Sequence, residues 1–409
     1  MRETRFKQTE IGEIPEDWEV TCIGDIADGF SYGVGAEAVS YNGVDKYIRI
    51  TDIDDDSHQF SPQPLMSPAF YFDKNIVQKN DILFARTGAS VGKTYLYNEN
   101  DGRLIFAGFL MKVHVKEDSS QFVFYNTLLQ RYNLWIQAES MRTGQPGINL
   151  EQLKTFKLPL PQIAEQERIA KALSDVDGLL RELDGVIAKK RAIKQGAMQE
   201  LLTGKRRLEG FEGEWKSHPF RDFYKYAAEG GTPNTSIKAY YENGKVPFVK
   251  IEDTTRKYIY ESKSFITEEG LRHASAWLVP ENSIIFTNGA TIGNVSINKI
   301  PVSTKQGILG IIPSDIIDLE FMYYLLSNSI FQKEVEARET KGTFATIILP
   351  RLNEIVSFIP KDKAEQSAIA TILSEMDADI EALEAKRAKY EQLKQGMMQE
   401  LLTGRIRLV

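Results

Sequence analysis

Two stretches of the chain carry the same alternation of apolar and polar residues. Apolar residues recur in each at alternating steps of four and three, which is the a/d pattern of a heptad repeat and predicts a long amphipathic helix. The second stretch, Ala364–Leu408, repeats the first, Ala164–Leu208, at a constant offset of 200 residues, and about half of the aligned positions are identical. We therefore expect two helices of about 40 residues, each roughly 60 Å long. The positions expected to pack between the helices are Ile169, Leu173, Val176, Leu180, Leu183, Ile187 and Leu201, and Ile369, Leu373, Met376, Ile380, Leu383, Met397 and Leu401.

The ends of both helices carry start and stop signals. A proline precedes each helix and a glycine follows its last apolar turn. These residues are Pro159, Pro161, Pro360, Gly204 and Gly404. Asp362 and Glu365 have the spacing of a capping box, so we expect both to close the start of the second helix.

A helix of this length cannot bury an apolar seam by itself. Each helix could dimerise with its copy in a second chain, or the two could pair with each other within one chain. The matching heptad registers favour pairing within the chain. We predict an antiparallel intramolecular coiled coil that brings Ile169 and Leu173 toward Met397 and Leu401, with the globular segments at its opposite ends.

The two globular segments, residues 1–158 and 209–358, share weaker landmarks and predict an α+β fold. The helical segments are then 159–208 and 359–409, and the whole chain is a pseudo-twofold cyclic repeat. Period-two alternation predicts matching strands, and longer apolar runs predict matching helices. The strands are expected at 47–52 and 248–253, a buried strand with a Gly-rich loop at 80–92 and 282–293, and the helices at 122–138 and 319–337.

Composition restricts the classes of function. The chain has 409 residues and a formal net charge of −7, which argues against a simple nucleic-acid-binding protein, since such domains are usually basic. One cysteine excludes a disulfide framework, and the four histidines have no metal-ligand spacing. The N-terminus lacks the apolar core of a signal peptide, and no apolar run could span a membrane. We therefore expect a cytoplasmic protein with no membrane partner.

The segment Gly88–Thr94 looks like a phosphate-binding loop but does not meet its requirements. A P-loop has four residues between its glycines, whereas three separate Gly88 from Gly92, and the second copy has Asn294 in place of Lys93. The acidic run 52–56 lacks the glycine and the distal glutamate of a calcium loop, so we expect a solvated turn. We identify no catalytic and no metal-binding residues.

Polar residues of the loops could instead contact DNA. Their side chains suit phosphate oxygens and base edges, although each one alone is more often an ordinary surface group. In the first segment they are Arg86, Thr87, Ser90, Lys93, Arg142, Thr143, Gln145 and Asn149. In the second they are Thr232, Asn234, Thr235, Asn288, Thr291, Asn294, Lys305, Gln306, Lys341 and Thr343.

Over essentially its whole length the chain resembles the specificity subunit of type I restriction-modification systems. The resemblance lies in two variable domains alternating with two near-identical helices, and in segments such as IPEDWEV, NDILFARTGASVGK, GGTPNT, INLEQLKTFKLPLP, AEQERIAKALSDVD and KQGAMQELLTG. The first domain departs from the second at GGTPNT, where it has SYGVGAE. The resemblance implies that each globular segment is a target-recognition domain that reads one half of a split double-stranded DNA site.

The same resemblance implies partners. The helices would set the gap between the half-sites and dock two methylation subunits, which bring S-adenosylmethionine and methylate adenine. Restriction subunits that use ATP and Mg²⁺ would join them, and this chain would have no active site or cofactor of its own. Two other classes stay open, a coiled-coil scaffold with two protein-binding domains and, more remotely, an enzyme with a nucleotide site.

Overall fold

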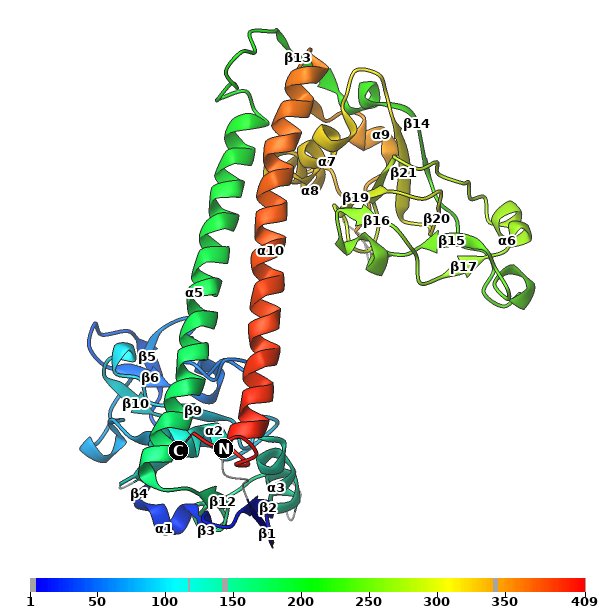
Figure 1. Ribbon diagram of the computed structural model, residues 1–409. Coiled ribbons are helices and arrows are strands. Elements are labelled where there is room, and N and C mark those ends of the chain that lie inside the picture. Colours follow the sequence, from blue (N-terminus) through cyan, green and yellow to red (C-terminus); the bar gives the residue numbers. More distant parts are fainter. Residues whose placement is uncertain (1–4, 117, 142–145, 341–344, 409) are drawn as a thin grey trace. The chain divides into compact units, whose positions relative to one another are not determined.

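The computed structural model describes residues 5–116, 118–141, 146–340 and 345–408. It divides into two compact units, each containing one globular segment and part of both long helices (Figure 1). Unit 1 comprises residues 1–184 and 386–409, and unit 2 comprises residues 185–385. None of the helices in the described part of the chain is long and apolar enough to cross a membrane.

The two long helices form where the heptad pattern predicts them. Helix α5 spans Ile163–Leu201 and helix α10 spans Lys363–Leu401, with 39 residues in each. Both end earlier than the predicted Leu208 and Leu408. The chain turns at Gly204 and Gly404, whose φ angles of 70° and 72° lie in the left-handed region that glycine adopts at helix ends.

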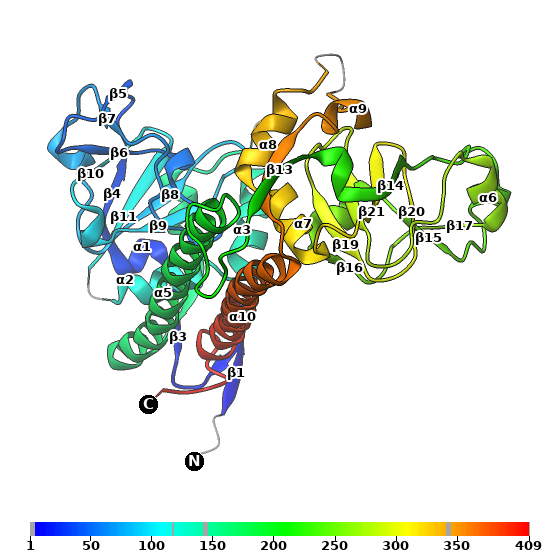
Figure 2. The ribbon, with the colours of Figure 1, turned by 90° about the horizontal axis from the view of Figure 1, so that it is seen from above.

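Within each unit the two helices lie side by side and run antiparallel (Figures 1 and 2). In unit 1, Lys394 Nζ lies 2.7 Å from Asp177, and Arg387 Nε lies 2.5 Å from Asp184. Partner numbers therefore rise along one helix as they fall along the other. Unit 2 repeats the direction, with the ion pairs Lys190–Asp379, Lys194–Asp377 and Arg191–Glu384. The predicted antiparallel pairing is confirmed in both units.

The apolar ends of the helices enter the cores of the units. In unit 1, Ile169 and Leu173 share a core with Leu401, and Met397 packs against it. In unit 2, Leu201 shares a core with Ile369 and Leu373, and Met376 packs against it. Leu180, Leu183, Ile187 and Ile380 are also buried, whereas Val176 and Leu383 are partly exposed. In the middle of the two helices, ion pairs flank these buried apolar residues.

The globular segment of unit 1 is built on a sheet in the order β4-β11-β8-β9. Smaller pairings are β1-β2, β3-β12, β5-β7 and the parallel pair β6-β10. The strands are β1 Phe6–Thr9, β2 Gly12–Pro15, β3 Glu19–Cys22, β4 Ala27–Tyr32, β5 Ala38–Ser40, β6 Lys46–Ile48, β7 Met66–Pro68, β8 Asp81–Ala85, β9 Thr94–Leu96, β10 Leu104–Phe106, β11 Leu110–Val115 and β12 Lys157–Leu160. The helices are α1 Ile23–Ile26, α2 Ser120–Asn126, α3 Gln130–Ser140 and α4 Leu150–Lys154.

Unit 2 repeats this plan with a sheet in the order β14-β21-β18-β19-β16. Its smaller pairings are β13-β22 and β17-β15-β20, in which β15 and β20 are parallel. The strands are β13 Trp215–Pro219, β14 Tyr224–Glu229, β15 Val246–Val249, β16 Tyr258–Ile259, β17 Phe265–Ile266, β18 Ile284–Thr287, β19 Val295–Asn298, β20 Ser303–Thr304, β21 Ile308–Pro313 and β22 Val356–Pro360. The helices are α6 Glu268–His273, α7 Leu319–Ser327, α8 Ser329–Glu336 and α9 Leu349–Leu352.

The strands predicted at 47–52 and 248–253 are shorter than expected. Each ends after a few residues and passes into a 3₁₀ turn, at Ile50–Asp52 and Ile251–Thr255. A carboxylate ends both strands, because Asp52 and Asp253 each accept a hydrogen bond of 2.9 Å from the backbone N–H three residues earlier. The donor is thereby removed from the ladder.

The helices predicted at 122–138 and 319–337 are each broken into two. In unit 1 the Thr127 hydroxyl donates to the Phe124 carbonyl at 2.6 Å between α2 and α3. In unit 2, Asn328 separates α7 from α8, accepting from the N–H of Ile330 and donating to the carbonyl of Met198. The Met198 contact holds the break against α5.

The capping box predicted for α10 is half formed. Asp362 accepts a 2.8 Å hydrogen bond from the N–H of Ala364. Glu365 instead accepts from Trp215 Nε1 at 3.2 Å and from Arg207 Nε at 2.6 Å. Glu365 therefore ties the helix to the globular segment of unit 2 rather than closing its own first turn.

Candidate nucleic-acid interface

In unit 1 the chain leaves strand β8 at Arg86, which is held on both sides. Its N–H donates to the Phe109 carbonyl at 3.0 Å, and its own carbonyl accepts from the N–H of Ile148 at 2.9 Å. The guanidinium carbon lies 4.8 Å from the centre of the Tyr32 ring. Within the described residues its Nε is buried without a hydrogen-bond partner. An arginine stacked in this way keeps a fixed plane of N–H donors for an acceptor pair.

Arg86 is flanked by two exposed aromatic residues that were not predicted from the sequence. Tyr32 is 40% exposed and Phe109 is 65% exposed. The Tyr32 hydroxyl accepts a 3.2 Å hydrogen bond from the N–H of Leu150, at the start of α4. In the sequence each aromatic adjoins a glycine, Gly33 or Gly108, and this pairing at a strand end is the only local signal for them.

The structure brings together only some of the residues predicted in unit 1. Thr87 forms a bridge to Gly147, and Asn149 caps α4 by accepting from Gln152 N–H at 2.8 Å; both lie beside Arg86 along the backbone. Lys93 turns away and pairs with Asp55 at 2.6 Å. Ser90 is partly buried and occupies the far part of the loop. Three predicted residues lie outside the described part of the chain, namely Arg142, Thr143 and Gln145.

Unit 2 has a corresponding arrangement around Asn288, after strand β18. The Asn288 N–H donates to Gly307 and its carbonyl accepts from Ile347, both at 2.9 Å. Its side-chain Nδ2 donates to the Ile347 carbonyl at 3.2 Å, while Oδ1 is buried without a partner among the described residues. Glu229 accepts a 2.6 Å hydrogen bond from the Gly307 N–H. Glu229 was not predicted.

The remaining predicted residues of unit 2 do not gather in one place. Thr232 Oγ1 accepts from the Gln306 N–H at 3.4 Å, and Lys305 next to it is exposed, so these lie near Glu229. Asn294 turns inward to Thr254 Oγ1 at 3.2 Å. Three more are exposed, namely Asn234, Thr235 and Thr291. The Asn234 side chain also accepts a hydrogen bond from the N–H of Ser236. Two lie outside the described residues, Lys341 and Thr343.

Sheet register shows that the two arrangements occupy equivalent positions. Strand β8 pairs Ala85 with Leu110 as β18 pairs Thr287 with Ile308. Strand β4 pairs Tyr32 with Met111 as β14 pairs Glu229 with Leu309. It follows that Tyr32, Arg86 and Phe109 correspond to Glu229, Asn288 and Gly307.

A glycine follows Tyr32 in unit 1 and Glu229 in unit 2. In both units the backbone at this glycine lies very close to a carbonyl oxygen of a neighbouring segment. A Cβ at Gly33 would lie 2.0 Å from the Ala107 carbonyl oxygen, and one at Gly230 would lie 1.9 Å from that of Thr304. The segments SYGVGAE and GGTPNT therefore hold the backbone alike at Gly33 and Gly230 despite their different sequences. The backbone differs at the third position, where Gly307 has a φ angle of 87°, in the left-handed region, and Phe109 does not.

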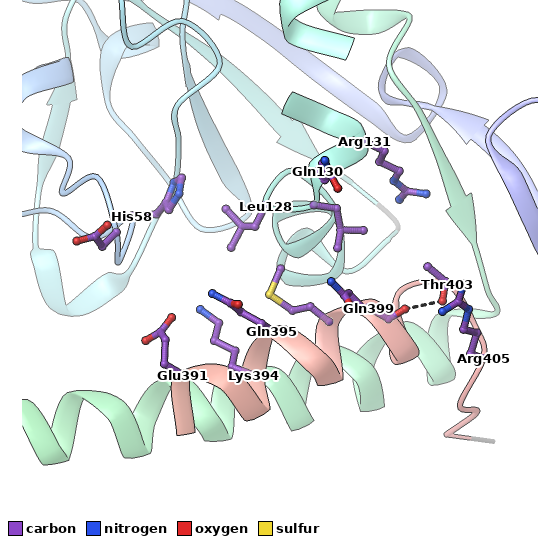
Figure 3. Close-up of a pocket in the computed structure, with 13 residues that line it drawn as sticks. His58, Leu128, Gln130, Arg131, Glu391, Lys394, Gln395, Gln399, Thr403 and Arg405 are labelled. Carbon is purple, nitrogen blue, oxygen red and sulfur yellow. Dashed lines mark hydrogen bonds between the residues drawn. The ribbon is translucent and has the colours of Figure 1, made fainter. Parts of the chain in front are cut away.

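A pocket of about 460 Å³ in unit 1 lies between α10 and the start of α3 (Figure 3). Its lining includes His58, Arg131, Lys394 and Gln399. Burial lowers the pKa of Arg131 to about 10, and its guanidinium donates to Asn126. The position equivalent to Arg131 is Ile330 in unit 2, so this cation is not repeated. The repeated loops are therefore the stronger candidate for a function shared by both units.

Metal chemistry finds no support in the residues that the structure describes. Among them, no group of three or more His, Cys, Asp or Glu side chains is arranged to hold an ion. Asp52, the first residue of the acidic run, is buried and pairs with Arg49 at 2.7 Å.

Comparison with known proteins agrees with the twofold architecture. The family profile of the type I restriction modification DNA specificity domain matches residues 15–189 and again residues 212–395. The chain therefore belongs to the family of type I restriction-modification specificity subunits. Members of this family are the DNA-recognition component of their systems and are not catalytic.

Individual relatives match over most of their length. The putative type I restriction enzyme MjaX specificity subunit of Methanocaldococcus jannaschii is 27% identical, with 100% of this chain and 98% of the relative covered. The EcoR124I/EcoR124II specificity subunit of Escherichia coli is 26% identical over 61% of this chain and 64% of its own. A crystal structure of the S subunit from M. genitalium has the same fold, with a TM-score of 0.59, 17% identity and coverage of 94% and 96%.

Proposed function

We propose that each unit reads one half of a split double-stranded DNA site and that the chain joins the two readings in one complex. The single observation that carries this is the repetition of one architecture around two different surfaces, Tyr32–Arg86–Phe109 in unit 1 and Glu229–Asn288–Gly307 in unit 2. Equivalent strand registers with unequal side chains suit two half-sites of unequal sequence. Exposed aromatic rings and cations beside backbone N–H groups are typical of nucleic-acid surfaces.

The helix pair carries the second part of the proposal, the setting of the gap and the docking of two methylation subunits. Two exposed glutamines near the end of each long helix are identical in the two copies. These are Gln195 and Gln395, and Gln199 and Gln399. An exposed face that occurs twice fits two copies of one partner.

A helical glycine lies on the same segment in both copies. A Cβ added at Gly196 or Gly396 would meet no atom of the chain within 4 Å, so neither glycine is needed for packing within the chain. Glycine inside a helix costs roughly 0.5–1 kcal/mol relative to alanine. The two other glycines of α5, Gly178 and Gly185, are also unobstructed, and both have alanine at the equivalent position of α10. The glycine kept in both helices supports close approach by a partner.

The net charge of −7 is compatible with this role if the methylation subunits supply most of the positive potential around the DNA. In the proposed complex those subunits hold S-adenosylmethionine and methylate adenine. Restriction subunits join through the complex and use ATP and Mg²⁺, and the assembly works in the cytoplasm. The chain itself contributes recognition and spacing, with no cofactor.

The proposal is tested by expressing the chain with its methylation subunits in a host that lacks adenine methylation and sequencing the modified bases. We expect methylation at one two-part sequence with a fixed gap. Exchange of residues 209–360 for those of a relative should change one half only. Strands β13 and β22 pair along their length, with Trp215 opposite Pro360 and Pro219 opposite Val356. Ending the exchange at residue 360 keeps this pair together, whereas ending it at residue 358 would divide β22.

The alternative is a coiled-coil scaffold whose globular segments bind proteins. A gel shift with and without methylation subunits separates the two proposals. Sequence-specific retention of DNA that requires this chain supports the recognition role. Assembly of a complex whose DNA binding is indifferent to this chain's globular segments would favour the scaffold.

A further inference from the structure

We infer that Arg86 reads a guanine in the half-site bound by unit 1, with Tyr32 as the positioning residue for its guanidinium. The inference rests on the proposed DNA-recognition function and specifies the chemistry of one half-site. Arginine offers two parallel N–H donors that match the O6 and N7 acceptors of guanine in the major groove. Adenine presents a donor at the corresponding edge and is rejected by the same fork.

The surroundings of Arg86 favour a base over a phosphate as its ligand. Its guanidinium carbon lies 4.8 Å from the Tyr32 ring centre, and the Tyr32 hydroxyl is itself held by the Leu150 N–H at 3.2 Å. The ring is thus fixed, and it fixes the plane of the guanidinium in turn. A phosphate contact needs only a mobile positive charge, whereas recognition of a base edge needs a fixed plane.

Unused hydrogen-bonding capacity points the same way. Arg86 makes no ion pair among the described residues, and its Nε is buried without a partner. The nearby cation Lys93, by contrast, is already neutralised by Asp55. A buried donor left unsatisfied is destabilising, and reordering around a bound acceptor would relieve that cost. The exposed ring of Phe109 adds an apolar flank to the bound base edge.

Unit 2 serves as an internal comparison because its strands have the equivalent register. It has Asn288 at the arginine position and Glu229 at the tyrosine position. The carboxylate of Glu229 is exposed and uses one oxygen for the Gly307 N–H. A carboxylate repels the acceptor edge of guanine and accepts from the amino groups of cytosine or adenine. We therefore expect no dependence on guanine at the equivalent place in the unit 2 half-site.

The test is binding selection from DNA randomised in both half-sites, with the full complex of this chain and its methylation subunits. In Arg86→Ala, preference for guanine at one position of one half-site should fall roughly tenfold to a hundredfold, and the other half-site should be unchanged. Arg86→Lys keeps the charge and should lose the preference while retaining more of the affinity. Tyr32→Leu should weaken the same preference, whereas Tyr32→Phe, which keeps the ring, should preserve most of it. Lys93→Ala is the matched control for loss of a nearby charge and should leave the preference intact.

Two results would overturn the assignment while leaving the proposed function standing. One is a uniform loss of affinity for all sequences in Arg86→Ala with a shallower salt dependence, which is the signature of a phosphate contact. The other is a unit 1 half-site in which the base preference at every position is the same for the wild-type chain and for Arg86→Ala. If the wild-type complex shows no two-part preference at all, the proposed function fails instead. Thermal unfolding of each variant checks that the fold is retained.

Discussion

Arg407 lies directly against Glu165, which precedes it by 242 residues. Its Nε and Nη2 donate to the two carboxylate oxygens at 2.7 and 2.8 Å. Glu165 also accepts from the indole N–H of Trp18 at 3.1 Å. The last turn of the chain, the start of α5 and the first globular segment therefore meet at one buried carboxylate in unit 1.

The same contact recurs in unit 2 with every partner displaced by about one repeat. Arg207 Nε and Nη2 donate to Glu365 at 2.6 and 2.8 Å, and Trp215 Nε1 donates at 3.2 Å. In each unit the arginine follows one long helix and the glutamate begins the other. In each unit this contact joins the end of one long helix to the start of the other. Its recurrence explains why positions 165 and 365 are both glutamate.

We predict that Arg407→Ala is strongly destabilising. It leaves the Glu165 carboxylate, whose side chain is 4% exposed, without its cationic partner, and breaking a buried pair costs about 3 kcal/mol. Arg207→Ala should also destabilise, because it leaves the Glu365 side chain, which is 0% exposed, without its cationic partner. It should cost less, since Arg407 alone of the two pairs with a second carboxylate, Asp17 at 2.8 Å, among the described residues. Urea unfolding measures both. Arg405→Ala is the control, since its pair with Glu400 at 3.7 Å is exposed and such pairs contribute little. Equal effects at 405 and 407 would contradict the argument.

Gly396→Ala should separate stability from assembly. No atom of the chain lies within 4 Å of the added Cβ, so the helix should gain roughly 0.5–1 kcal/mol. Docking of a methylation subunit should weaken if its backbone approaches this glycine. Thermal unfolding and sedimentation of the reconstituted complex give the two readouts. Gly178→Ala is the matched control, because it should stabilise similarly and leave assembly unchanged; a loss of assembly in both variants would remove Gly396 from the docking face.

His58 should make unit 1 sensitive to acid. Burial lowers its pKa below the ordinary value, and its Nδ1 donates to the Thr94 carbonyl at 2.8 Å. Because the unfolded chain then binds the proton more readily than the folded one, stability is complete above the ordinary pKa of about 6.5 and falls as the pH drops through it. Urea midpoints at pH 7 and pH 5 should differ less in His58→Asn, which keeps a donor but cannot titrate. If His58→Asn loses as much stability between pH 7 and pH 5 as the wild-type chain, the acid sensitivity comes from other groups.

The sequence predicted what depends on local pattern and missed what depends on distant contacts. The heptad rows of α5 and α10 are repeated over many turns, so the repeated stretches from Ala164 and Ala364 begin within one residue of the helices. The helical segments predicted from 159 and 359 begin four residues too early, on β12 and β22. The break at Asn328 could not, because it is held by the Met198 carbonyl 130 residues away. Arg86 was identified from its loop, but exposure of Tyr32 and Phe109 follows from sheet register, which apolar alternation alone does not reveal.

Helix length should set the gap between the half-sites. The end of α5 is a poor place to test this, because Leu201 and Leu202 there are buried in the core of unit 2. The middle is better, since Leu183 and Ile187 on either side of Gly185 are buried but belong to neither core, and ion pairs such as Lys190–Asp379 and Arg387–Asp184 flank them. Four residues inserted into both helices, after Gly185 and after Ala385, leave both apolar ends intact. A four-residue insertion is a stutter, which coiled coils accommodate by local unwinding.

Each insertion adds about 6 Å of helix, and B-DNA rises about 3.4 Å per base pair. We therefore predict that the doubly extended chain keeps both half-sites and prefers a gap longer by one or two base pairs. Methylation of DNAs that differ only in gap length measures the preference. Insertion into α5 alone is the control: it displaces Lys190 from Asp379 and shifts the seam on one side only, so it should destabilise the chain. An unchanged gap preference in the doubly extended chain would mean that the helices do not set the spacing between the half-sites. That result would favour the coiled-coil scaffold.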